Sequence, residues 1–578
     1  MAGRGESRRR VKAASSRPAH AGPDTIIQGG KVITCDAGGS VADALAVKDG
    51  RIMAVGKGAD IAGLADGHTD TIDAAGRAVV PGLIDGHAHL DREGLKSVFP
   101  SLAGCTSIDD ILQRIEALAK QKSPGEWIVT MPVGDPPYYW DVPDNLAEKR
   151  LPTRWELDRV APDNPVYIRP IWGYWRHVLP ICSVANSLAL EIAGLGPGME
   201  PPPEAIEFET DPETGQFNGI IVENTFVPIA ELGYFHMMPR FEHADRVGGL
   251  RAAMRSYNAC GTTGVFEEHG CAQELIRAWQ AVHDAGDMTV RARLMFSPSW
   301  LSMGETDPAR VLGGWAAWLG GTGLGDDWLR VAGLYTEFGI GAENRLRARA
   351  APYTGWAGFN ADCGVPRARM RDLLVAAAEA DIRIATIEIG YLDLYEEVDR
   401  IVPIRDRRWI IGHLNCATPD QIARIRDLGL VMTAHTNRYI FKDGHRTREQ
   451  IGGAAENTIS PLRSLREAGV HVALATDNVP NSLFHPVWHA VSRYNRVSQD
   501  AIAPDQALSR AEALRCATIE GAHLTFEEDV RGSLEAGKFA DVAVLSDDPL
   551  TCPEDTIKDI VAEITMVGGD IVYRREET

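Results

Sequence analysis

The chain has 578 residues, too many for one ordinary domain and enough for a large barrel with a smaller companion domain. Its formal net charge is -21, and so acidic a surface repels phosphate backbones, which argues against nucleic acid as a partner. The 9 cysteines are scattered and form no C-x-x-C pair. The sequence therefore predicts neither a disulfide framework nor a thiolate zinc site, and it favours the reducing cytoplasm.

The N-terminal residues 1–23 are rich in Arg, Ser, Ala and Gly, and we expect them to form a disordered tail. The run Arg8-Arg9-Arg10 is typical of the start of a signal peptide, but no apolar segment follows it, so export is not expected. No apolar stretch approaches the length of a membrane span, so no membrane contact is expected either. The composition leaves open whether the chain forms a homo-oligomer.

Both ends of the chain predict short strands joined by tight turns. Near the N-terminus, Asp49-Gly50 separates two apolar runs, which is a strong hairpin signal. The segments 541–545 and 564–573 show the same pattern near the C-terminus. We therefore expect residues 24–80 and 525–578 to form one composite domain, a small β-sandwich built from both chain ends.

Between these ends, residues 81–524 alternate strands with helices. Ser107 is suited to cap a helix whose apolar residues follow the helical period. Further along, apolar strands are predicted to begin at Trp409, Leu430 and Val470, with helices between them. Alternation of this kind indicates an α/β fold with a parallel sheet, and at this length a (β/α)₈ TIM barrel.

The stretch from about 95 to 235 interrupts this alternation and is rich in proline and aromatic residues. We interpret it as an insertion that covers the barrel mouth, because TIM-barrel sites lie where the strand-to-helix loops are long. An accessory domain packed on the side of the barrel is the alternative. Within it, Tyr174, Arg176 and His177 are candidates for binding a substrate oxygen, although Arg176 is equally suited to a surface ion pair.

The strongest chemical signal is an apolar strand that runs directly into His87-Ala88-His89. Residues two apart on a strand face the same side of the sheet, so both imidazoles can bind one cation. Two later predicted strands end at His413 and at Asp477. Imidazole and carboxylate are the ligands expected for zinc or a similar divalent ion. The sequence therefore predicts one ring of metal ligands at a barrel mouth.

Several motifs of the chain together resemble those of a known family. These motifs are Pro81 to His89, Asn186-Ser187, Asp211 to Gly215 leading to Glu223, Gly532 to Asp541, and Thr565 to Gly569. From Asp24 onward the chain resembles the amidohydrolase superfamily, specifically the amidohydrolase 3 group that includes the YtcJ-like proteins. The resemblance implies metal binding by His87, His89, His413 and Asp477, with His413 and Asp477 also assigned to catalysis. It implies one or two divalent ions, with zinc preferred.

Two positions depart from the family pattern. Relatives often carry a lysine on the fourth strand, where this chain has Gly333, and a histidine on the fifth, where Glu388 is the nearest residue able to bind a metal. Either one metal remains, or Glu337 and Glu388 supply the missing ligands; salt bridges or capping are the alternative roles of these carboxylates. His269 and His435 also end predicted strands, and we expect them to have supporting or structural roles.

The expected function is metal-dependent hydrolysis of a C–N bond in a small-molecule amide, cyclic amide, urea or carbamate by activated water. The aromatic insertion favours an apolar or aromatic substrate, although core packing explains aromatic residues equally well. Two alternatives remain: deamination of an amino-heterocycle at the same centre, and a non-catalytic relative that keeps the barrel as a scaffold.

Overall fold

The computed structural model describes residues 21–139, 141–171, 179–196, 198–301, 307–339, 341–360 and 362–576. The predicted tail lies almost wholly outside the described residues, as do Tyr174, Arg176 and His177. Among the described residues, no helix is both long and apolar enough to cross a membrane.

Eight parallel strands form the central sheet, in the spatial order β8-β14-β15-β17-β18-β19-β20-β21. Their bounds are β8 Leu83–Asp85, β14 Thr262–Cys271, β15 Arg291–Phe296, β17 Leu329–Tyr335, β18 Ile384–Thr386, β19 Ile410–Ile411, β20 Val431–Ala434 and β21 Val472–Leu474. The backbone N–H of Gly86 donates to the carbonyl of Leu474, which brings the first strand against the last. The predicted TIM barrel is confirmed.

Helices follow the barrel strands and pack around the sheet. They are α8 His243–Ala259, α9 Gln273–Asp284, α10 Pro308–Leu319, α12 Arg367–Glu379, α13 Leu392–Asp399, α14 Pro419–Asp427, α16 Leu462–Glu467, α17 Phe484–Ser492, α18 Arg510–Cys516 and α19 Ile519–Leu524. The start of α14 shows local sequence control, because Thr418 and Gln421 form a reciprocal capping box there.

Strands from both chain ends share one sheet, in the order β24-β23-β22-β7-β2-β3. These are β2 Lys31–Ile33, β3 Val41–Ala42, β7 Ala78–Pro81, β22 Val542–Leu545, β23 Ala562–Val567 and β24 Asp570–Arg574. A second sheet, β5-β4-β1-β6, contains β1 Thr25–Gln28, β4 Ala44–Lys48, β5 Arg51–Gly56 and β6 Asp70–Asp73. One apolar core joins Leu45 and Val79 to Val544 and Met566, so the sandwich built from both ends is confirmed.

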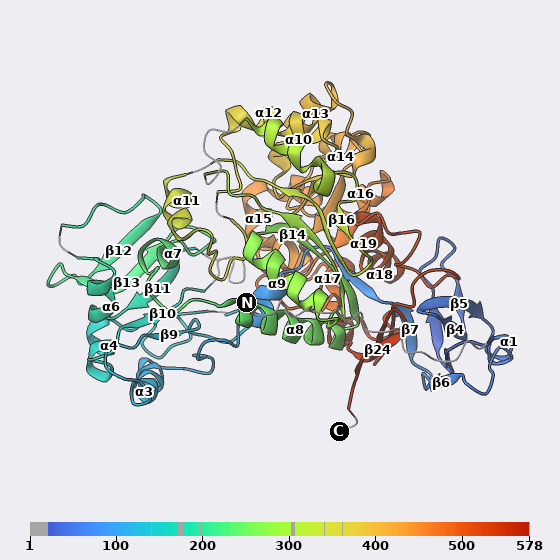
Figure 1. Ribbon diagram of the computed structural model, residues 1–578, viewed down its shortest axis with the longest axis horizontal. Coiled ribbons are helices and arrows are strands. Elements are labelled where there is room, and N and C mark those ends of the chain that lie inside the picture. Colours follow the sequence, from blue (N-terminus) through green and yellow to red (C-terminus); the bar gives the residue numbers. More distant parts are fainter. Residues whose placement is uncertain are drawn as a thin grey trace, which may run out of the picture.

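A five-stranded sheet, β12-β13-β11-β10-β9, lies between the first two barrel strands in sequence. Its strands are β9 Ile128–Thr130, β10 Val166–Ile168, β11 Ile181–Ala185, β12 Ile206–Thr210 and β13 Phe217–Glu223, flanked by α3 Ile108–Ala119, α4 Arg154–Val160, α6 Ser187–Ile192 and α7 Ala230–Tyr234. Ser107 caps α3, as predicted. Figure 1 shows this sheet at one end of the molecule and β4 to β6 at the other, with the barrel between them.

The insertion and the barrel share one hydrophobic cluster, in which Val133 and Ile168 join Phe266 and Val431 of the barrel strands. The insertion therefore packs on the barrel through a continuous hydrophobic core. We propose that it covers the mouth of the barrel.

Candidate metal centre

Five buried histidines meet at the carboxyl ends of four barrel strands. Their ligand atoms form two groups, each with all atoms within 4.8 Å of one another; the groups are His87, His89 and His269, and His87, His413 and His435. The two groups share His87, which follows the first barrel strand. Parallel strands of a barrel end at the same face, so residues far apart in sequence converge there.

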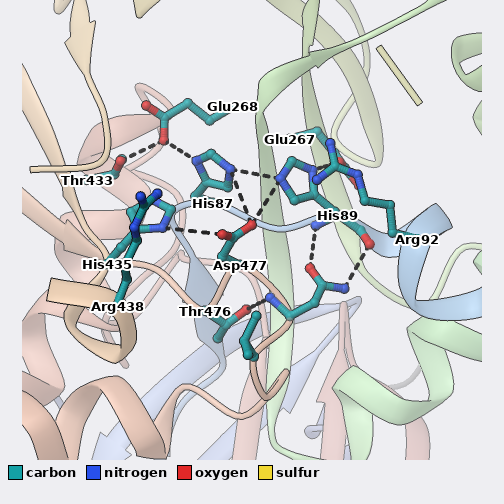
Figure 2. A network of polar contacts seen from close by, with 12 residues as sticks. His87, His89, Arg92, Glu267, Glu268, Thr433, His435, Arg438, Thr476 and Asp477 are labelled. Atoms are coloured by element: carbon teal, nitrogen blue, oxygen red, sulfur yellow. Dashed lines mark hydrogen bonds and ion pairs between the residues drawn. The ribbon is translucent and has the colours of Figure 1, made fainter. Parts of the chain in front are cut away.

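Asp477 completes this cluster from the end of the last strand (Figure 2). Its Oδ1 atom lies 3.2 Å from Nε2 of His89 and 3.9 Å from Nε2 of His87, and these two nitrogens are 2.9 Å apart. Its Oδ2 atom lies 3.9 Å from Nδ1 of His435. Two imidazole nitrogens and one carboxylate oxygen therefore point at a common position.

The backbone holds this geometry at some conformational cost. His413, Asp477 and Asn478 have φ angles of 52°, 53° and 60°, a left-handed region that residues with a Cβ rarely adopt. The Asn478 side chain accepts a hydrogen bond from the N–H of His89 at 2.8 Å and donates to its carbonyl at 2.8 Å. Strain of this kind clusters at functional sites, where surrounding contacts fix it.

Asp85 ties the first strand to the last and does not point at the common position. It accepts hydrogen bonds from the Thr476 hydroxyl at 2.5 Å, the Thr476 N–H at 3.0 Å and the His87 N–H at 3.1 Å. Burial raises the pKa of Asp85 to about 7, although these hydrogen bonds oppose the shift. Its role is to hold the backbone that presents His87 and Asp477.

Two consecutive glutamates of β14 approach the outer nitrogens of the first-strand histidines. Glu268 Oε2 lies 2.8 Å from Nδ1 of His87 and accepts a 2.6 Å hydrogen bond from the Thr433 hydroxyl. Glu267 Oε2 lies 3.5 Å from Nδ1 of His89. Neighbouring residues of a regular strand face opposite ways, but the register of β14 with β15 shifts between Glu267 and Cys271.

The position of the Glu268 carboxylate also explains why a glycine follows the sixth barrel strand. A Cβ atom on Gly412 would lie 1.9 Å from Oε1 of Glu268, so the carboxylate occupies space that only glycine leaves free. In the sequence, this pair of carboxylates is indicated by the run Phe266-Glu267-Glu268-His269 at a strand end. Our prediction considered only the histidine of this run.

Burial controls the charge of the cluster. It lowers the pKa values of His89, His269, His413 and His435 well below the usual histidine value. Neutral imidazole is the form that binds a cation. Neither ring nitrogen of His435 has a hydrogen-bond partner among the described residues. This donor set, with its nearby carboxylates, fits a divalent metal ion.

The structure separates the predicted ligands into two sets. His87, His89, His413 and Asp477 lie together. Glu388 is exposed, and Glu337 accepts a 3.2 Å hydrogen bond from the Tyr335 hydroxyl; neither belongs to the two groups of clustered ligand atoms. His269 and His435, expected only in supporting roles, lie in those groups instead. A Cβ on Gly333 would meet the Arg383 carbonyl at 2.6 Å, so this position faces the neighbouring strand.

Comparison with known proteins decides the family, because residues 70–573 match the amidohydrolase family along most of the chain. The chain belongs to the amidohydrolase family. This membership confirms that the protein is an enzyme, and it argues against the non-catalytic scaffold.

Two relatives show how far the similarity extends along this amidohydrolase. N-substituted formamide deformylase of Arthrobacter pascens is 29% identical over 576 residues, covering 96% of this chain and 98% of the relative. The putative amidohydrolase YtcJ of Bacillus subtilis is 23% identical over 571 residues, covering 95% and 99%. Both alignments span nearly the whole of each chain, so the similarity includes the insertion and both chain ends.

A solved structure supports the architecture. An uncharacterized metal-dependent hydrolase from Pyrococcus horikoshii superposes with a TM-score of 0.65 at 21% identity, covering 92% of this amidohydrolase and 99% of that chain. At this identity the likeness concerns the fold alone.

Proposed function

We propose that this amidohydrolase hydrolyses the C–N bond of a small amide at a divalent metal held by His87, His89 and Asp477. The observation that carries the proposal is the convergence of the two Nε2 atoms and Oδ1 of Asp477 within 3.9 Å of one another. His413 and His435 lie beside His87 and extend the donor set. Zinc suits imidazole and carboxylate donors and is the metal we expect.

The chain's own groups supply the proton transfers. A divalent ion, when bound, supplies Lewis-acid activation of water and of the scissile carbonyl. Asp477 faces the common position and is 4% exposed, so it is placed to accept a proton from the attacking water and deliver it to the leaving nitrogen. Asp85 and Asn478 hold the backbone on either side of it and keep the carboxylate in place.

The substrate class follows from chemistry and from the relatives. The Arthrobacter pascens relative is named for deformylating N-substituted formamides, and it aligns with nearly the whole of this chain. We infer that this amidohydrolase acts on an N-substituted amide of the same general type. Tyr138 and Phe226 of the insertion lie against side chains of the barrel mouth and favour a substrate with an apolar part.

The test measures metal content per chain and hydrolysis of a panel of formamides, acetamides, cyclic amides and ureas. Wild-type protein should contain a divalent metal, and His87→Ala/His89→Ala should lose both metal and activity. The matched control is His236→Ala/His243→Ala, since both of these histidines are exposed. Metal retained at wild-type occupancy in the first variant would refute the assignment. Release of ammonia from amino-heterocycles, with every amide left intact, would instead establish deamination.

A further inference from the structure

The ring of His269 lies against a phenylalanine ring that the chain supplies after the fourth barrel strand. The ring centroids of His269 and Phe359 are 4.4 Å apart and the two planes are inclined by 19°, so the rings are stacked. Tyr335 also contacts His269, at 4.7 Å, but its ring is tilted by 56°. Aromatic rings in contact favour particular relative orientations. Phe359, which is 2% exposed, is therefore placed to fix the plane of the His269 ring.

The orientation of the His269 ring decides whether this residue can bind a metal. A neutral imidazole binds a cation through a ring nitrogen, and the ligand atom of His269 lies within 4.8 Å of those of His87 and His89. The torsion that rotates a histidine ring about its Cβ–Cγ bond has only broad preferences. The adjacent backbone is closely packed, since a Cβ atom on Gly270 would lie 2.7 Å from Cβ of Ser297. Contacts of the ring itself must therefore select its orientation.

The backbone on both sides of Phe359 is held against the ends of the second and third barrel strands. The carbonyl of Gly358 accepts a 2.8 Å hydrogen bond from the N–H of Ala272, which follows β14. The N–H of Asn360 donates to the hydroxyl of Ser297 at 3.1 Å, and its side-chain amide donates to the Ser297 carbonyl at 2.6 Å. Ser297 follows β15. The phenyl ring is thus attached to the same part of the barrel that carries His269.

A buried arginine joins this loop to the insertion. Arg347 ends the helix α11 Ala342–Arg347, is 4% exposed and donates to the carbonyl of Phe359 at 3.4 Å. Its guanidinium carbon lies 4.7 Å from the centroid of the Phe359 ring, within the range of a cation–π contact. The preceding residue, Leu346, shares a hydrophobic cluster with Ile221 and Ala230 of the insertion. The insertion therefore supports the loop that presents Phe359 to His269.

We propose that Phe359 is a positioning residue for His269, and that the stacked ring raises the affinity of the group His87, His89 and His269 for a divalent metal. This inference rests on the proposed function, because it requires that this group binds a metal. Outer contacts that orient metal-binding histidines typically change metal affinity about 10- to 100-fold when they are lost. Stacking provides no hydrogen bond, so we expect the lower end of that range.

The experiment is a double-mutant cycle on the full-length protein, read out as zinc affinity by competition with a chelating dye after the metal has been stripped. Phe359→Leu should weaken zinc binding about tenfold in the wild-type background. In the His269→Ala background the same change should alter the affinity by less than about twofold, because a residue that acts through His269 has no ring left to orient. The cycle requires no turnover.

The matched control removes a stacked phenylalanine elsewhere in the barrel. Phe338 stacks on Tyr391 at 3.9 Å and 19° is replaced there by a similar inclination of 13°, and neither residue belongs to the two groups of ligand atoms. Phe338→Leu should leave zinc affinity unchanged. In the cobalt-substituted protein, the visible absorption bands of Phe359→Leu should shift towards those of His269→Ala, since these bands report the ligand geometry. Loss of stability alone would not move them in this direction.

An equal loss of affinity in both backgrounds would overturn the proposal, as would wild-type affinity in Phe359→Leu. Thermal unfolding of the metal-free variants checks that each is folded. If Phe359→Leu is unfolded, Phe359→Met, which fills more of the space without a planar ring, takes its place in the cycle. The proposed function fails separately, by absence of metal or of hydrolysis in wild-type protein, which is measured before any variant is made.

Discussion

Glu268 Oε2 lies 2.8 Å from Nδ1 of His87, while Nε2 of the same ring lies 2.9 Å from Nε2 of His89. One imidazole therefore connects a buried carboxylate to the position where the proposed metal ligands converge. Carboxylates that contact the outer nitrogen of a metal-binding histidine fix its tautomer and orientation and raise its basicity.

Replacing Glu268 with Gln should weaken metal binding about 10- to 100-fold, because the charge that supports His87 is lost while the side-chain size is kept. Competition with a chelating dye measures the affinity. Glu267→Gln should have a smaller effect, since its carboxylate is 3.5 Å from Nδ1 of His89. Glu116→Gln on α3, where the side chain is 47% exposed, is the control. Unchanged affinity in Glu268→Gln would mean that the carboxylate serves only packing.

The choice between histidines and glutamates as additional ligands can be tested directly. His435→Ala and His269→Ala should each lower metal affinity by at least about tenfold, since their ring nitrogens lie in the two groups of ligand atoms. Glu388→Gln should bind metal like the wild type, because this side chain is exposed. Affinity measurements on all three variants check the prediction. Metal loss in Glu388→Gln alone would restore the ligand set expected from sequence.

Asp477→Asn keeps the size of the side chain but removes a group able to take a proton at neutral pH. Turnover should fall about 10²- to 10⁴-fold, the usual contribution of general acid–base catalysis, while the fold survives. If Asp477 only stabilised the local backbone as a cap, the variant would lose about 1 kcal/mol of stability and keep its activity. Kinetics and thermal unfolding of the same preparation separate the two results, with exposed Asp60→Asn as the reference.

Away from the centre, Glu527 accepts hydrogen bonds from Nε of Arg293 at 3.1 Å and from Nε of Arg531 at 3.0 Å. Burial alone would raise the pKa of Glu527, but the two guanidinium groups outweigh it and lower the pKa from 4.5 to about 2. A lowered folded-state pKa stabilises the protein above the unfolded value, and this contribution is lost as pH falls from 4.5 towards 2.

Glu527→Gln should therefore cost about 3–5 kcal/mol at pH 7, because it leaves two buried guanidinium groups without their shared carboxylate. Its thermal unfolding temperature should lie below that of the wild type at pH 7, and the gap should narrow between pH 4.5 and pH 2 as wild-type Glu527 becomes protonated. Unfolding scans across this range measure the gap. A gap that stays constant with pH would show that the carboxylate's charge contributes nothing.

The sequence by itself determined the barrel, the sandwich built from both chain ends and the core of the proposed centre. His87 and His89 could be assigned together because alternation places residues two apart on one face of a strand. His413 and Asp477 could be added because each ends an apolar strand in an alternating α/β pattern. These inferences need only local periodicity, which the chain carries residue by residue.

Only the tertiary structure decided which other groups join them. The register shift in β14 lets the consecutive residues Glu267 and Glu268 both approach histidines, which regular alternation forbids. His435 meets His87 only because the barrel closes and brings the seventh strand's end within reach of the first. Glu388, which the family resemblance made a candidate ligand, is exposed instead. Distances between strands far apart in sequence depend on barrel closure and on strand irregularities. Neither can be predicted from the spacing of residues along the sequence.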